Sequence, residues 1–185
     1  TDFDKISYEV ISGNNGPTNN ITNLYFSGGQ TVKNPDNSQT VTFQLQSSDG
    51  KVIQHIYQVR PDNYMIDFTI STNGTRQLLS NNTLFLTWQN KALQLQKDLD
   101  YEKGQSQISF NLDDEYDYYM ISSRTEKEFS DPVKWVSVKQ QFFNSAIVAR
   151  QSSFSSARGD WTARENGNTV VQGTANLKMV VPAGD

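Results

Sequence analysis

Apolar and polar residues alternate with a period of two through much of the chain. The alternation is clearest over residues 41–46, 64–70 and 171–181. Successive side chains of a strand point to opposite faces of a sheet, so each of these stretches predicts a strand with one buried face. In the second stretch we expect Tyr64 and Ile66 to lie on the buried face.

Turn-forming residues separate the alternating stretches. The run Arg60-Pro61-Asp62-Asn63 divides residues 52–59 from the strand that follows, and this arrangement predicts a hairpin. Two shorter strands are expected over residues 84–88 and 108–112, with a polar stretch between them. Residues 1–40 are rich in glycine and asparagine, which predicts loops and edge strands.

Helix-forming residues cluster only over residues 89–98 and 135–149. The second cluster has mixed periodicity. We interpret it as a strand, a single helical turn over Gln140–Asn144 and another strand, with the side chains of Phe142 and Phe143 buried. The predicted fold class is therefore all-β, an antiparallel sandwich with at most one or two short helical turns.

Length and composition limit the classes of protein to which the chain can belong. Its 185 residues suit one large sandwich, so we predict a single domain over residues 1–185. The net charge of -4 comes without a clustered basic stripe, which argues against nucleic-acid binding. No apolar run approaches the length of a membrane span. The chain begins and ends like a trimmed piece, so we expect it to be a fragment of a larger protein.

Few residues of the chain offer catalytic chemistry. It has no cysteine and a single histidine, His55, which falls within a predicted strand. A thiolate nucleophile and a metal site with two histidines are therefore excluded within this chain. We expect His55 to lie at the surface or edge of a sheet, and we predict no enzyme activity, no catalytic residue and no cofactor.

Two short motifs have both a functional and a structural interpretation. The carboxylates within residues 113–117 are of the type that binds calcium, but they lack the Asp-x-Asp-x-Asp-Gly spacing of a loop site, so a solvated loop is favoured. Arg158-Gly159-Asp160 matches an adhesion tripeptide, and here a hairpin tip is favoured over a ligand site. We assign no metal site to either motif.

The segment from Lys134 to Ala149 closely resembles a stretch in the large periplasmic domain of YidC-type membrane protein insertases. In that family Trp-Val-Ala and a Gln-Gln-aromatic-Phe run precede a short apolar strand. The residues standing in those places are Trp135, Val136, Gln140, Gln141, Phe142, Phe143 and Ala146. The hairpin over residues 59–68, the Thr-Trp element over residues 86–91 and Pro182-Ala183-Gly184 are also similar to the family.

This resemblance implies a β-supersandwich similar to galactose-mutarotase folds, in which the motif residues are structural and no residue is catalytic. It implies a location on the periplasmic face of the bacterial inner membrane, with attachment through segments outside this chain. The implied role is to assist the insertion and folding of membrane proteins. The implied partners are Sec translocon subunits and nascent membrane proteins, and no cofactor is implied.

Two other functional classes remain open at this point. A carbohydrate-binding sandwich would stack sugar rings on Trp88, Trp135 or Trp161, although large aromatic side chains more often belong to a core. A surface adhesion domain would need Arg158-Gly159-Asp160 to be exposed and available. Both alternatives depend on where these side chains lie in the fold.

Overall fold

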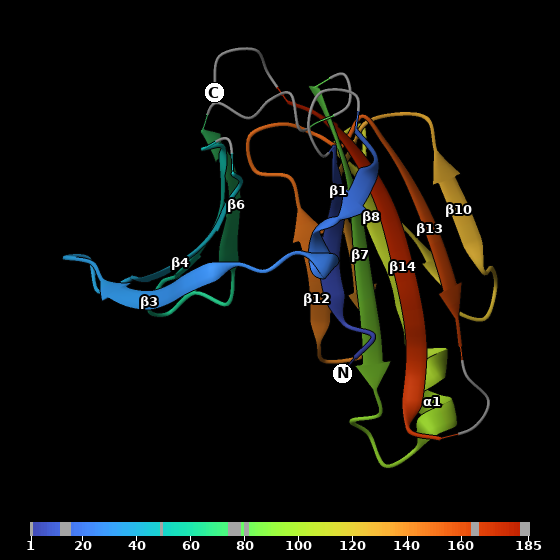
Figure 1. The fold of residues 1–185 in the computed structure, drawn as a ribbon. Coiled ribbons are helices and arrows are strands. Elements are labelled where there is room, and N and C mark those ends of the chain that lie inside the picture. The colour runs from blue at the N-terminus through green and yellow to red at the C-terminus, as the bar shows by residue number, and fades with distance from the viewer. Residues whose placement is uncertain are drawn as a thin grey trace. The chain divides into compact units, whose positions relative to one another are not determined.

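The structure, a computed structural model, describes residues 2–11, 16–48, 50–73, 79, 82–163 and 167–181. The Pro182-Ala183-Gly184 element lies outside these residues. The strands form three antiparallel sheets, which confirms the predicted all-β class. The chain divides into two compact units, one made of Thr1–Glu9 with Thr83–Asp185 and the other of Val10–Asn82 (Figure 1).

Two of the sheets belong to the first unit. In the larger sheet, neighbouring strands follow the order β10-β13-β14-β7-β1. In the smaller sheet the order is β12-β11-β8-β9. The bounds in the larger sheet are β1 Lys5–Ile11, β7 Thr83–Leu93, β10 Glu126–Phe129, β13 Ser156–Thr162 and β14 Thr169–Val180. Those in the smaller sheet are β8 Gln107–Leu112, β9 Glu115–Met120, β11 Val133–Lys139 and β12 Asn144–Val148.

The two sheets of the first unit pack face to face. A side chain at Gly173 on β14 would lie 3.8 Å from both Trp161 on β13 and Val138 on β11. The rings of Phe110 on β8 and Phe129 on β10 have centroids 4.6 Å apart. These contacts join one sheet to the other through apolar side chains, so the first unit is a β-sandwich with its core between the sheets.

Strand β14 is the long strand that the alternation over residues 171–181 predicts. It pairs with β7 on one side and β13 on the other. The side chains of Val171, Ala175 and Leu177 are buried, whereas Asn176 and Lys178 are exposed. A period of two therefore identified both the strand and its inner face correctly.

The helix of the first unit lies where the sequence predicted only a polar connection. Helix α1 spans Leu99–Gly104, and its N-cap Asp98 accepts a hydrogen bond from the backbone of Tyr101. The helical candidate over residues 89–98 was wrong, because its first half continues strand β7. Among the described residues, no helix has the length and hydropathy that crossing a membrane requires.

The interpretation of residues 134–149 as strand, helical turn and strand was wrong in its middle part. Strands β11 and β12 form a tight hairpin, in which the amide of Gln140 donates to the carbonyl of Phe143 at 2.8 Å. The loop between this pair holds only Gln141 and Phe142, which is too short for a helical turn.

The N-terminal region contains more regular structure than its glycine and asparagine content indicated. Strand β1 pairs with β7, with Tyr8 opposite Leu86. Tyr8 and Val10 are buried, so β1 contributes to a core and is more than a loop segment. The predicted edge strands are present in β3 Ser27–Lys33, which ends its sheet. Strand β1 instead lies inside a sheet and was not predicted, because the few apolar positions of residues 5–11 are outnumbered by neighbouring turn formers.

The connection between β8 and β9 is a two-residue turn at Asp113 and Asp114. Their φ angles are 49° and 62°, a left-handed conformation that aspartate tolerates and that two-residue hairpin turns require. Glu115 and Asp117 follow in β9 and are exposed. The carboxylates are therefore solvated as predicted, but on a turn and a strand rather than a loop.

The second unit contains a four-stranded antiparallel meander with the order β3-β4-β5-β6. The strands of this meander are β3 Ser27–Lys33, β4 Gln39–Gln46, β5 Val52–Val59 and β6 Ile66–Asn73. The same unit also contains the short strand β2 Thr18–Asn20 and the 3-10 helix η1 Ile21–Asn23. The strand and turn pattern predicted over residues 41–70 is confirmed. The predicted burial of Tyr64 and Ile66 was wrong. Tyr64 is fully exposed and Ile66 has a relative exposure of 62%, both near the turn between β5 and β6.

Candidate functional site

The β11–β12 hairpin carries the motif residues that the sequence singled out, and Gln140 is the most buried polar residue among them. Its Nε2 donates to the carbonyl of Leu93 at 2.8 Å and to Oε1 of Glu102 at 2.9 Å. Only 7% of Gln140 and 1% of Glu102 are exposed. The hairpin is thereby fixed to the end of β7 and to α1.

Glu102 accepts further hydrogen bonds within this cluster. Its Oε2 accepts from the amide of Leu95 at 2.9 Å and from the amide of Gln96 at 3.0 Å. A buried carboxylate needs such partners, because burial removes its hydration. The cluster accounts for both Gln140 and Glu102 as groups that hold the fold of the first unit together.

The other motif residues divide between core and surface. Val136 is buried and Trp135 is half-buried, with its ring centroid 6.0 Å from that of Tyr116. Phe142 and Phe143 are 68% and 57% exposed, so the prediction that this aromatic pair is buried was wrong. Phe142 lies in the two-residue loop and Phe143 directly after it, at the end of the hairpin.

Ala146 and Gln141 complete the motif. Ala146 is exposed and pairs across the hairpin with Ser137, while Gln141 is half-buried in the loop. The seven residues therefore form one hairpin, but they do not converge on a shared cleft. The geometry gives Gln140 and Val136 structural positions and leaves Phe142, Phe143 and Ala146 available at the surface.

The outer face of the smaller sheet has a polar and aromatic surface next to this hairpin. The Gln107 amide donates to the hydroxyl of Ser109 at 3.0 Å and also to the hydroxyl of Tyr116. Ser109 and Ser137 are buried and lie opposite each other on β8 and β11. This arrangement offers hydrogen-bonding groups but contains no base held against a nucleophile.

A cavity of about 450 Å³ lies on the larger sheet. Its lining residues are Phe3, Thr125, Glu126, Asp160, Trp161, Thr162, Gln172 and Thr174. The two carboxylates are already paired with Arg158, whose guanidinium lies 2.6 Å from Glu126 and 3.1 Å from Asp160. Hydrogen bonding and charge from Asp160, with the charge of Glu126, raise the pKa of Arg158.

The residues of the adhesion tripeptide take part in these contacts. Arg158-Gly159-Asp160 lies within strand β13, between β10 and β14, so the predicted hairpin tip was wrong. Arg158 and Asp160 bind each other in this strand. A strand in the middle of a sheet does not present the tripeptide as a projecting loop, and this placement disfavours the adhesion alternative.

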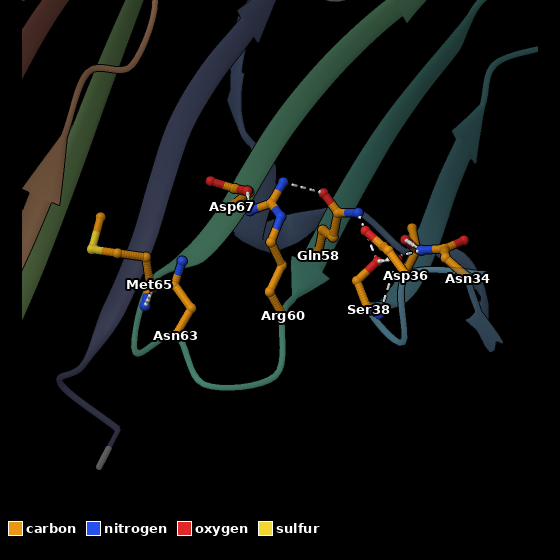
Figure 2. Close-up of polar contacts among 9 residues, drawn as sticks. Asn34, Asp36, Ser38, Gln58, Arg60, Asn63, Met65 and Asp67 are labelled. Carbon is orange, nitrogen blue, oxygen red and sulfur yellow. Dashed lines mark hydrogen bonds and ion pairs between the residues drawn. The ribbon is translucent and has the colours of Figure 1, made fainter.

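In the second unit, polar side chains form a chain of contacts across the ends of β4, β5 and β6 (Figure 2). The guanidinium of Arg60 binds Asp67 and donates to Gln58 at 2.7 Å. The Gln58 amide donates to Ser38 at 3.0 Å, and the Ser38 hydroxyl donates to Asp36 at 2.6 Å. The hydrogen bonds from Ser38 lower the pKa of Asp36.

This network stabilises turns and does not form a reactive centre. Ser38 is completely buried, and its hydroxyl also accepts from the Asn34 amide at 2.9 Å, so it is fully used in bonds to Asp36, Asn34 and Gln58. Beyond the network the hairpin end carries exposed apolar residues. These are Val59, Tyr64, Met65 and Ile66.

His55 lies in the middle of β5, a central strand of the second unit's sheet. Its ring stacks on Phe26 with centroids 4.3 Å apart and meets the edge of Phe68 at 5.3 Å. Burial among these rings lowers the pKa of His55 below its ordinary value of 6.5. Among the described residues no group of three or more His, Cys, Asp or Glu side chains is placed to hold a metal ion.

The three tryptophans do not make a common platform. Trp161 is 3% exposed and belongs to the core between the sheets. Trp88 and Trp135 are half-buried on different sheets, in β7 and β11. Stacking of one sugar on several tryptophans therefore has no support in the geometry.

Comparison with known proteins gives a consistent result. The family described as the YidC periplasmic domain matches residues 5–185. A membrane protein insertase YidC from Phocaeicola vulgatus is 30% identical over 115 residues, which cover 60% of this chain and 18% of the relative. The YidC of Bacteroides fragilis is 31% identical over 125 residues, covering 66% of this chain and 20% of the relative. The YidC of Cytophaga hutchinsonii is 28% identical over 144 residues, covering 77% of this chain and 23% of the relative.

The matched region spans about a fifth of the length of these relatives. The family match over residues 5–185 includes residues of both compact units and the β11–β12 hairpin. Sequence reasoning found the hairpin through its motif but missed Glu102, the partner of Gln140. The signal for Glu102 was weak, since an N-cap aspartate and one glutamate in a polar stretch also describe an exposed turn.

Proposed function

The chain belongs to the YidC periplasmic domain family, and from this membership we propose that it is an accessory domain of a membrane protein insertase. The observation that carries the proposal is the family match over residues 5–185, which spans both compact units. In this role the domain assists the insertion and folding of inner-membrane proteins. The insertion step itself belongs to parts of the protein outside this chain.

The proposed location is the periplasmic face of the bacterial inner membrane. The relatives are named membrane protein insertases, and this chain corresponds to about a fifth of their length. We propose that segments outside the chain anchor the domain to the membrane. The two units would then form one periplasmic module of a multi-pass protein.

The domain is proposed to act by binding rather than by catalysis. The only histidine of the chain packs among aromatic rings with a lowered pKa, and the carboxylates of the cavity are paired with Arg158. General acid–base catalysis usually uses a titratable group held near neutral pH against a partner. Neither place has that arrangement.

The proposed partners are Sec translocon subunits and nascent membrane proteins. The surface that supports a binding role is the exposed end of the β11–β12 hairpin, where Phe142 and Phe143 are largely uncovered. Exposed aromatic side chains are typical of binding surfaces, because they bury a large apolar area when a partner covers them, and Gln140 bonds this hairpin to β7 and α1.

A deletion in the full-length protein tests the accessory role. We expect that removing residues 5–181, at equal protein levels in the membrane, slows the insertion of a Sec-dependent membrane protein without abolishing it. Protease protection of the newly made protein measures insertion. Unchanged insertion would contradict an assisting role, and complete loss would show that the domain is essential rather than accessory.

Site-directed photo-crosslinking tests the partners. A benzophenone amino acid at Phe142 should crosslink to a Sec translocon subunit or to a nascent membrane protein, each identified by immunoblotting. The matched control position is Tyr101, which is 54% exposed on α1 of the same unit. Equal crosslinking from both positions, or none from Phe142, would count against a docking surface at the hairpin.

A further inference from the structure

Strands at the edge of a sheet present unpaired backbone groups, and proteins protect them with charges, proline or bulges. Most edge strands of the described sheets have such protection. Strands β9 and β10 carry charged side chains, and β6 carries Asp67. Strand β3 has a register shift between Gly28 and Gln30.

Strand β12 is an edge strand without these features. It ends the sheet order β12-β11-β8-β9, and its sequence Asn-Ser-Ala-Ile-Val contains neither a charge nor a proline. Its pairing with β11 runs without a register shift. Asn144, Ser145 and Ala146 are exposed, and Ile147 and Val148 are half-buried. An edge with no charge, proline or register shift favours pairing with another strand.

The register of the hairpin shows which backbone groups of β12 are directed outward. Two hydrogen-bonded pairs flank the two ends of β12. They are Gln140–Phe143, at 2.8 Å, and Lys134–Ala149, at 2.9 Å. Bonded and non-bonded pairs alternate along an antiparallel ladder, and the register between these two pairs is regular. The residues whose amide and carbonyl groups point away from β11 are Asn144, Ala146 and Val148.

We propose that β12 accepts an added strand from an extended, uncharged polypeptide segment. Donors and acceptors that recur at every second residue match the backbone of an extended chain. The side chains beside them are small or apolar, and the exposed rings of Phe142 and Phe143 offer apolar contacts at the loop end. This inference rests on the hydrogen-bonding register and edge composition, and it does not depend on the proposed insertase role.

Titration with a synthetic peptide tests the inference. The probe is a peptide of about eight residues, alternating valine and threonine, added to the 185-residue chain. At saturation we expect the amide hydrogen exchange of Asn144, Ala146 and Val148 to slow by roughly tenfold or more. A peptide methylated on alternate backbone nitrogens should not bind. Equal binding of the methylated peptide, or protection only elsewhere, would overturn the proposal.

Two variants at Ala146 separate main-chain from side-chain recognition. Ala146→Pro removes one outward amide that β11 does not use, which an edge strand tolerates, and should weaken peptide binding by roughly tenfold. Ala146→Ser keeps that amide and should bind within about twofold of the wild type. Circular dichroism checks that both variants fold. If the proline variant does not fold, Ala146→Lys replaces it, because a lysine protects an edge without removing an amide.

A measurement of self-association tests whether a second copy of this chain, rather than a foreign segment, pairs with β12. If sedimentation shows dimers of the chain, and the same three amides are protected without peptide, then a second copy occupies the edge and the proposal of a foreign segment fails. If the chain stays monomeric, and Ala146→Pro and Ala146→Ser bind the peptide equally, strand addition at β12 is excluded.

Discussion

Gln140 joins three elements of the first unit through one side chain. Its amide bonds to Leu93 at the end of β7 and to Glu102 in α1, while its backbone belongs to the β11–β12 hairpin. The partners are 47 and 38 residues away in the sequence. A local pattern can therefore mark Gln140 as part of a motif, but only the folded chain shows why a glutamine stands there.

Replacing Gln140 with alanine should destabilise the first unit. Gln140→Ala would leave one oxygen of the buried Glu102 without its donor, and an unsatisfied buried group costs roughly 1–3 kcal/mol. Urea unfolding followed by tryptophan fluorescence measures the change. The matched control is Gln141→Ala, at the neighbouring half-buried loop position, where we expect a change within about 0.5 kcal/mol. Equal effects of the two variants would contradict this account of the cluster.

His55 should make the stability of the second unit depend on pH. Burial lowers the folded-state pKa below the ordinary value of 6.5, so the unfolded chain takes up a proton first as pH falls. The contribution to stability is complete above about 6.5 and is lost as pH falls from there through the folded pKa. Urea unfolding followed by circular dichroism between pH 7.5 and 5.5 measures the loss. His55→Phe should reduce it, and an unchanged pH dependence in that variant would exclude His55 as its source.

At the scale of elements, backbone conformation decides where the chain bends. Gly28 has a φ of 105°, at the register shift where β3 pairs with β4. A methyl group there would lie 2.7 Å from the carbonyl oxygen of Thr42. Gly50 also has a positive φ, of 83°, but no atom lies within 4 Å of the corresponding position. A side chain at either glycine would strain the backbone, but only a side chain at Gly28 would also collide with a neighbouring atom.

Gly28→Ala should therefore destabilise the second unit more than Gly50→Ala does. Both variants carry the cost of a positive φ, of about 1–2 kcal/mol, and only Gly28→Ala adds a collision with the backbone. Urea unfolding followed by circular dichroism compares the two variants. Equal losses of stability would show that the collision is relieved by a small shift of β3.

Strands were predicted well where one face is buried along the whole element. Residues 171–181 alternate cleanly and form β14, whose inner residues pack against the opposite sheet. Alternation was less informative at hairpin ends, where Tyr64 before β6 and Ile66 at its first position keep the apolar period but are exposed to solvent. The prediction that Phe142 and Phe143 are buried failed for the same reason, since both are exposed at the end of the β11–β12 hairpin. Apolar residues at an element's end identify neither burial nor exposure.

At the scale of the whole molecule, the sequence predicted the fold class and the family but not the division of the chain. Composition and alternation describe both units equally, because each is made of antiparallel strands. The division follows from which strands pair, and those pairings join distant residues, as when β1 pairs with β7. A single domain over residues 1–185 therefore stays a prediction, which unfolding experiments can test.

The distribution of tryptophan makes that test direct. Trp88, Trp135 and Trp161 all belong to the first unit, so their fluorescence reports on that unit, whereas circular dichroism reports on the strands of both. If the units unfold separately, the two signals should give different urea midpoints. Gly28→Ala should then lower the stability seen by circular dichroism and leave the fluorescence curve in place. Coincident curves that shift together in this variant would instead show that the 185 residues unfold as one cooperative domain.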